Sequence, residues 1–248
     1  TIEVTTFRSN QPQPSSKKRR QTENGLLLRD NVFGSLEDDA SRRDLSINAL
    51  YYCPSENNIR DYTRGVLDIK NRFIRIIGTP NVRFREDPVR LLRVVRFAAK
   101  LGFIIDKETS ASMYMLASNI KQISAPRLFD ESLKLFMRGY SLKASVLLKK
   151  YGLFQYMLPQ LFHRMENDDY ASRLVEQTFI NTDLRVKANK RITPAFIYAA
   201  LLWPAVQNTA RNLRDKGETP LDALNIAVDR TIAIQVKITA IPKRFTIP

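Results

Sequence analysis

The sequence predicts an α+β protein in which a small mixed part, residues 1–80, is followed by a mostly α-helical part, residues 81–248. Two observations predict this class. The apolar runs that suit β-strands lie within the first 80 residues, whereas apolar residues after that point recur at helical spacing. With 248 residues, of which 44% are hydrophobic, the chain is long enough to form a real core.

The mixed part begins with residues 1–7, which alternate in the manner of a strand and place Glu3 on the face opposite Ile2 and Val4. Residues 8–30 are rich in Gln, Pro, Ser and basic side chains, a composition typical of a mobile loop because it buries little apolar surface. The loop is either a solvated connector or a flap that contacts RNA phosphates. The basic residues that would make those contacts are Lys17, Lys18, Arg19 and Arg20.

A short helix and two strands complete the mixed part. Residues 35–38 (SLED) have the pattern of a capping box, so a helix is expected to begin there and to carry Arg42 and Arg43 near its end. Residues 47–52 and 73–77 are strand-like apolar runs, and the mixed part is expected to end near Pro80.

The helical part is predicted to begin at residues 86–88 (EDP), where acidic residues and a proline suit the first turn of a helix. Apolar residues then recur at helical spacing until Gly102 ends the helix. Further helices are expected over residues 109–120, 126–138, 141–151, 170–181, 193–212 and 219–235. The sequence has no fixed-period repeat, which favours a compact irregular helical domain over a solenoid.

The net charge of +15 indicates a polyanionic partner, and RNA is the first candidate. One Cys and one His cannot supply the ligands of a structural zinc site. The sequence contains neither an apolar run long enough to span a bilayer nor an export signal, and its single Cys cannot form an internal disulfide. We therefore expect a cytoplasmic protein with no membrane partner.

Three groups of residues are candidates for chemistry: Glu3, the triplet Arg42-Arg43-Asp44, and residues 86–93. Each group, taken alone, has a simpler structural explanation, because such residues commonly form surface ion pairs or stabilise a helix start. Together they suit a nucleoside triphosphate, because phosphates need arginine, metal ions need carboxylates, and a base edge needs a donor and an acceptor.

Residues 86–93 are predicted to present their polar side chains from one helix. Asp87 and Arg90 are three residues apart and are expected side by side on one helix face, where they could read a base. Arg93 follows on the same side, within reach of a phosphate or ribose. The alternative role for Arg93 is structural, namely a salt bridge to Glu86 or Asp87.

Three longer stretches resemble a known family. Residues 2–8 (IEVTTFR), 42–50 (RRDLSINAL) and 86–97 (EDPVRLLRVVRF) are similar to motifs of the class II nucleotidyltransferases, which comprise bacterial poly(A) polymerases and tRNA CCA-adding enzymes. Within that family the sequence is closer to the poly(A) polymerases. That likeness lies in residues 24–35 (NGLLLRDNVFGS), 125–135 (APRLFDESLKL) and 240–244 (AIPKR).

The resemblance implies a role for each candidate residue. Glu3 matches a third active-site carboxylate, and Asp44 matches an active-site aspartate beside the nucleotide. It further implies that Arg43 and Arg93 contact the triphosphate or ribose, while Asp87 and Arg90 form the base-reading pair. Residues 1–80 are then part of the nucleotidyltransferase palm, and residues 81–248 are the helical neck and body that bind the nucleotide base and RNA.

The sequence departs from the family's pattern at one point. The family's Gly-Gly phosphate motif and the Asp-x-Asp pair that binds two metal ions are expected before Thr1. We therefore expect a fragment that holds no complete metal site and is inactive alone.

For the complete enzyme, the resemblance implies that an RNA 3′ end attacks the α-phosphate of ATP with Mg²⁺ as cofactor, so that pyrophosphate leaves. CCA addition to tRNA is one alternative. A fragment that only binds RNA is the other.

Overall fold

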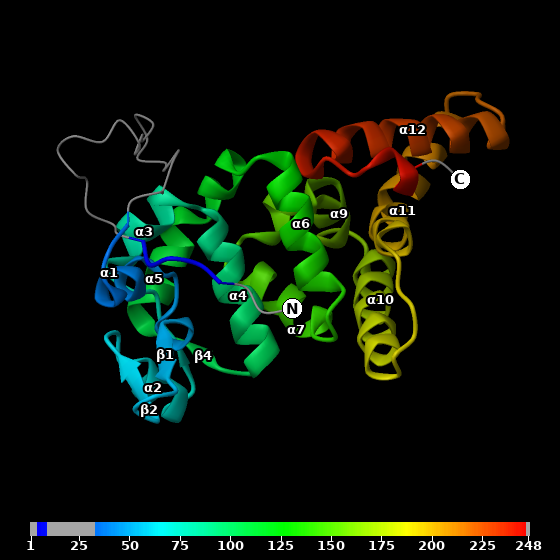
Figure 1. Ribbon diagram of the computed structural model, residues 1–248. Helices are drawn as coiled ribbons and strands as arrows, with labels where there is room; N and C mark the ends of the chain where they lie inside the picture. Colours follow the sequence, from blue (N-terminus) through cyan, green and yellow to red (C-terminus); the bar gives the residue numbers. More distant parts are fainter. Residues whose placement is uncertain (1–3, 9–32, 247–248) are drawn as a thin grey trace. The chain divides into compact units, whose positions relative to one another are not determined.

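The computed structural model describes residues 4–8 and 33–246 and divides the chain into two compact units, Thr1–Asn119 (unit 1) and Ile120–Pro248 (unit 2) (Figure 1). Each unit has its own buried core. The division predicted near residue 80 separates a nucleotidyltransferase palm from a helical part that binds the nucleotide base and RNA. Because it assigns functions to the two parts, it stays a prediction.

Unit 1 begins, in its described part, with residues 4–8 in an exposed segment. The strand expected over residues 1–7 is wrong for residues 4–7, because neither described sheet contains a strand that pairs with them. Within residues 4–8, Arg8 alone forms an isolated antiparallel bridge, and its partner is Phe33. Helix α1 (Leu36–Arg42) begins at the predicted capping box, where the Ser35 hydroxyl accepts a hydrogen bond from the Asp38 backbone N–H.

Two small sheets follow. The strand expected over residues 47–52 begins later, because Ser46–Asn48 form a 3-10 turn (η1) before β1 (Leu50–Cys53). Strand β1 pairs antiparallel with β2 (Asn58–Asp61), with Leu50 opposite Asp61. Strand β3 (Phe73–Ile74) is shorter than the expected 73–77 and pairs parallel with β4 (Ile104–Ile105).

A glycine allows helix α2 (Gly65–Lys70) to approach η1. A Cβ atom at Gly65 would lie 2.3 Å from the Ser46 carbonyl oxygen, a distance that no side chain tolerates. Figure 1 shows α2 beside the β1–β2 hairpin. This close packing fixes the backbone just after Arg42–Asp44.

Three helices complete unit 1. Helix α3 (Pro80–Glu86), which the sequence did not predict, precedes α4 (Val89–Leu101), and α4 ends at Gly102 with a positive φ of 66° as expected. Helix α5 (Lys107–Leu116) begins at Asp106 and is followed by the 3-10 segment η2 (Ala117–Gln122). The largest fully buried apolar side chains of the unit belong to Leu45, Ile74, Phe84, Leu91, Leu92 and Met113.

Unit 2 is built from helices, as predicted. Helices α6 (Ala125–Phe136), α7 (Ser141–Lys150), α10 (Asp169–Lys187), α11 (Pro194–Arg214) and α12 (Pro220–Thr239) confirm the predicted segments, with α10 continuing six residues beyond its expected end. The short helices α8 (Phe154–Met157), α9 (Pro159–Met165) and η3 (Lys243–Phe245) were not predicted.

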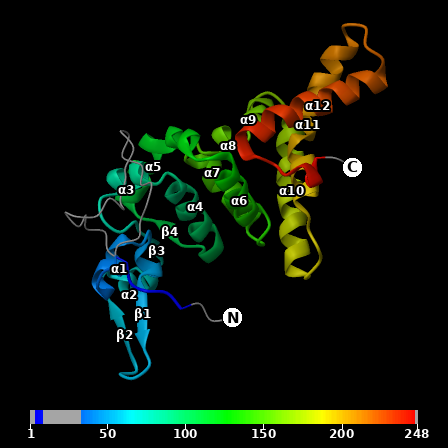
Figure 2. The same ribbon diagram turned by 45° about the horizontal axis from the view of Figure 1, so that its top comes forward.

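Helices α11 and α12 pack along each other as a long helical hairpin (Figure 2). Their contact buries Val206 and Leu213 of α11 against Ala223 and Ala227 of α12, and these small alanines let the helices approach closely. None of the described helices is long and apolar enough to cross a membrane.

Candidate nucleotide-binding site

The Arg42–Asp44 segment leaves α1 and runs antiparallel to residues 75–77. The Ile77 backbone N–H donates to the Asp44 carbonyl at 3.0 Å, and the Ser46 N–H donates to the Arg75 carbonyl at 3.1 Å. Leu45, between them, is fully buried. Because side chains alternate along an extended segment, burying Leu45 turns its neighbour Asp44 to the opposite side.

Asp44 meets two arginines of α4. Its Oδ1 accepts from Arg90 Nε at 2.8 Å, and its Oδ2 lies 2.7 Å from Arg93 Nη1. Arg90 and Arg93 are three residues apart and therefore lie on one face of α4. The sequence predicted, as the alternative role of Arg93, a salt bridge to Glu86 or Asp87. Arg93 does form a salt bridge, but with Asp44.

These side chains line an open pocket of about 300 Å³, whose lining residues are Arg42, Arg43, Asp44, Asn48, Arg90 and Arg93. Four guanidinium groups and one carboxylate leave the lining with a positive charge. Guanidinium groups are the preferred partners of phosphate and carboxylate oxygens, because their N–H groups bind two oxygens at once. The pocket is therefore suited to an anionic ligand.

Arg83 of α3 holds the backbone of this segment. Its Nη2 donates to the carbonyls of Arg42 and Arg43 at 2.6 and 2.8 Å, and its Nη1 pairs with Glu86 at 2.9 Å. Burial lowers the pKa of Arg83 from its ordinary value. Sequence reasoning missed this residue, since nothing local indicates a contact to residues some 40 positions earlier in the chain.

The arrangement predicted for Asp87 and Arg90 is wrong. Asp87 lies between α3 and α4 in an extended conformation (φ −147°, ψ 96°), so the two residues do not share a helix face. Asp87 Oδ1 accepts from the Val89 backbone N–H at 3.3 Å, and Asp87 does not line the pocket. Arg90 is buried and also binds Glu86 and the Arg83 carbonyl. The base-reading role of these residues stays a prediction.

The structure brings together four of the six arginine and carboxylate residues named for nucleotide chemistry: Arg43, Asp44, Arg90 and Arg93. Glu3 lies outside the described residues. So do the basic residues predicted to contact RNA, which are Lys17, Lys18, Arg19 and Arg20.

The described residues do not fit a magnesium site. Within residues 4–8 and 33–246, no group of three or more His, Cys, Asp or Glu side chains is placed to hold a metal ion. Both carboxylate oxygens of Asp44 bind arginines, which leaves that group unsuited to a cation in this state. The requirement for Mg²⁺ therefore stays a prediction.

Comparisons with known proteins identify the family of this chain. Residues 1–75 match the family model described as the poly A polymerase head domain, and residues 102–165 match the one described as a probable RNA and SrmB-binding site of polymerase A. Poly(A) polymerase I of Escherichia coli O6:H1 is 43% identical over 250 residues, which cover 99% of this chain and 54% of that protein.

The chain belongs to the bacterial poly(A) polymerase family.

Other members and relatives agree with this assignment. Poly(A) polymerase I of Haemophilus influenzae is 40% identical over 99% of this chain and 55% of its own length. The CCA-adding enzyme of Bacillus subtilis is more distant, at 34% identity over 67% of this chain and 40% of that enzyme. The chain thus spans about half the length of the curated poly(A) polymerases it matches.

Solved structures show the same fold. A CCA-adding enzyme in an apo form aligns with a TM-score of 0.53 at 19% identity, over 86% of this chain and 60% of that one. A CCA-adding enzyme in complex with ATP aligns with a TM-score of 0.52 at 18% identity, over 85% and 45%. The poly(A) polymerase chain therefore has a nucleotidyltransferase fold.

Proposed function

We propose that the protein containing this chain adds AMP units from ATP to RNA 3′ ends without a template, with release of pyrophosphate. The observation that carries the proposal is the 43% identity to a poly(A) polymerase I over 99% of the chain. The arginine-lined pocket of unit 1 supports it, because a triphosphate is an anionic ligand of the kind that such a pocket binds.

Within this proposal, Arg43 and Arg93 hold the triphosphate. The Arg93 side chain is 37% exposed and that of Arg43 is 43% exposed, so each can reach a ligand, whereas the Arg90 side chain is only 7% exposed. Arg90 instead fixes Asp44 and the end of α3. Holding the phosphates in a defined orientation lowers the entropy cost of bringing the α-phosphate to the RNA 3′-oxygen.

RNA is the proposed second substrate, and the net charge of +15 supports it. Such a charge gives affinity for the phosphate backbone that falls as salt concentration rises. Residues 102–165, which include α6 and α7, match a family model named for RNA binding, and we place RNA contacts there. The predicted Mg²⁺ requirement, the contacts from Lys17 to Arg20, and the cytoplasmic location belong to the same proposal.

A tailing assay tests the function. The full-length protein is incubated with Mg²⁺, a generic RNA oligonucleotide, and either ATP or CTP. We expect long ATP-dependent tails and little use of CTP. If the oligonucleotide is not extended but a trimmed tRNA receives C and A residues, the protein is a CCA-adding enzyme, the candidate favoured by the 34% identity to such an enzyme.

Two variants connect the assay to the pocket. Arg93→Ala is expected to raise the KM for ATP about tenfold through the loss of a charged hydrogen bond. Arg75→Ala is the matched control, because Arg75 is also ion-paired in unit 1, to Asp68 and Asp106, but does not line the pocket. Equal KM values for both variants would contradict the proposed place of ATP.

A further inference from the structure

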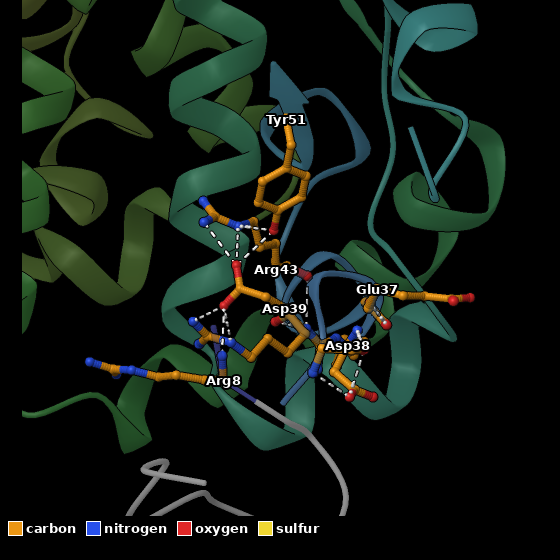
Figure 3. Close-up of polar contacts among 10 residues, drawn as sticks. Arg8, Glu37, Asp38, Asp39, Arg43 and Tyr51 are labelled. Carbon is orange, nitrogen blue, oxygen red and sulfur yellow. Dashed lines mark hydrogen bonds and ion pairs between the residues drawn. The ribbon is translucent and has the colours of Figure 1, made fainter. Parts of the chain in front are cut away.

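Asp39 is a buried carboxylate in α1 that binds both arginines of the Arg42–Arg43 pair. Its Oδ1 accepts from Arg42 Nε at 2.8 Å and Nη2 at 2.6 Å. Its Oδ2 accepts from Arg43 Nε at 3.1 Å and Nη2 at 3.0 Å. Figure 3 shows this carboxylate between Arg43 and the backbone of Arg8. Each oxygen therefore holds one guanidinium group.

Helix geometry creates this arrangement. Arg42 and Arg43 follow Asp39 at three and four positions, the spacing at which side chains meet on a helix surface. Tyr51 of β1 adds a hydrogen bond of 2.6 Å from its hydroxyl to Asp39 Oδ2, and the Arg43 guanidinium lies 5.3 Å from the centre of the Tyr51 ring (Figure 3). Arg43 is thus held by a carboxylate, a hydroxyl and an aromatic face.

Asp39 is ionised at neutral pH. Burial alone would raise its pKa, but hydrogen bonds from Tyr51, Arg42, Arg43 and the Arg8 backbone lower it well below the ordinary value. The negative charge of Asp39 stabilises this arrangement, because Arg42 and Arg43 are adjacent in the chain and their like charges repel each other.

The carboxylate stands behind the pocket and not inside it. Asp39 is 2% exposed and is not among the lining residues, whereas Arg42 and Arg43 both line the pocket. Asp39 binds Nε and Nη2 of each arginine, and Nη1 of Arg43 is not among its donors. An anion in the pocket therefore meets N–H groups that are already oriented, without meeting the negative charge that orients them.

We propose that Asp39 is a positioning residue for nucleotide binding, which fixes Arg42 and Arg43 in the orientation that receives the phosphate oxygens of a nucleoside triphosphate. The inference rests on the proposed function. A free arginine loses side-chain conformational entropy when a ligand fixes it, and an arginine that is already fixed does not lose it again. Asp39 thereby strengthens binding without touching the ligand.

A purely structural role for Asp39 is the competing explanation. Comparing ligands with and without phosphate groups distinguishes the two explanations. If Asp39 orients phosphate-binding arginines, its loss weakens phosphate-bearing ligands and leaves a phosphate-free ligand unchanged. If Asp39 only stabilises the fold, its loss affects every ligand alike. The probes are ATP, inorganic tripolyphosphate and adenosine, with dissociation constants measured by calorimetry on the full-length protein.

Asp39→Asn keeps the shape of the side chain and removes the charge. We expect it to weaken ATP and tripolyphosphate about tenfold, in line with the loss of charge-assisted hydrogen bonds, while adenosine binding stays within about twofold. Asp106→Asn is the matched control, because Asp106 is also a buried carboxylate of unit 1 that pairs with an arginine, Arg75, outside the pocket. It should leave all three dissociation constants unchanged.

Three results overturn the inference. Unchanged ATP and tripolyphosphate binding in Asp39→Asn contradicts positioning, and equal weakening of adenosine indicates a structural role. If the wild-type protein binds neither ATP nor tripolyphosphate, the proposed function fails first. Should Asp39→Asn not fold, Tyr51→Phe replaces it, since it removes one hydrogen bond to Oδ2 and is expected to weaken tripolyphosphate about threefold with no change for adenosine.

Discussion

The pocket of unit 1 contains two arginine pairs that are held in different ways. Arg42 and Arg43 are fastened to Asp39, which lies behind them and does not line the pocket. Arg90 and Arg93 are fastened to Asp44, which does line it. The side chain of Asp39 is 3% exposed and that of Asp44 is 11% exposed.

The difference teaches which pair is ready for an anion. A carboxylate behind the arginines orients them, and it leaves Nη1 of Arg43 to the ligand. A carboxylate inside the pocket competes with a phosphate for the same N–H groups, but it also presents an acceptor to a ligand hydroxyl or amino group. We infer that Arg42 and Arg43 are ready to receive phosphate, whereas Arg93 binds the triphosphate only in competition with Asp44.

The largest expected effect comes from replacing Arg90, the buried member of the Arg90–Arg93 pair. Arg90→Leu removes one of the two arginine partners from Asp44 and from Glu86, and breaking largely buried ion pairs is strongly destabilising. We expect the free energy of unfolding, measured by urea denaturation, to fall by about 3 kcal/mol. Arg60→Leu, which removes an exposed pair with Glu56, should cost less than about 1 kcal/mol. Equal losses for both variants would show that Arg90 does not hold the site together.

An intermediate effect is expected from removing the carboxylate inside the pocket. Asp44→Asn relieves the competition for Arg93, so tripolyphosphate should bind about threefold more tightly in calorimetry. The same variant should lose most AMP addition, since Asp44 is the predicted active-site aspartate. Glu56→Gln, an exposed acidic residue of the same unit, is the control and should change neither quantity. Weaker tripolyphosphate binding in Asp44→Asn would contradict the difference drawn between the two pairs.

The smallest effect concerns acid stability. Because the pKa of Asp39 is lowered in the folded state, its stabilising contribution is fully present above the ordinary value of 3.8 and is lost as the pH falls below it. The free energy of unfolding of the wild-type protein should therefore fall as the pH is lowered below about 4, and that of Asp39→Asn should fall less. Parallel pH profiles for the two proteins, measured by urea denaturation, would contradict the charge assigned to Asp39.

Sequence alone predicted the parts of this site that depend on local patterns. The capping box at Ser35 and the end of α4 at Gly102 follow from local patterns. The family resemblance indicated one site for Arg43, Asp44 and Arg93, which line one pocket, while their roles stay predictions. Asp39 was also within reach, because its three- and four-residue distances to Arg42 and Arg43 on a predicted helix indicate contact.

The rest depends on tertiary structure. Helix α3 has no strong apolar period, so the sequence pattern predicts Asp87 on the helix of Arg90, whereas Asp87 lies between two helices. The contact of Arg83 with the Arg42 and Arg43 carbonyls joins segments about 40 residues apart, and no local pattern encodes it. Residues 4–7 alternate like a strand, but a strand also needs a neighbour, which neither described sheet provides.

The central claim is that ATP binds through its phosphates in the arginine pocket of unit 1. The most direct test is the dissociation constant for ATP of the full-length wild-type protein, of Arg43→Ala and of Arg75→Ala, measured by calorimetry. We predict that Arg43→Ala weakens ATP about tenfold or more and that Arg75→Ala binds ATP like the wild type. Wild-type ATP affinity in Arg43→Ala, or equal weakening in both variants, would contradict the claim.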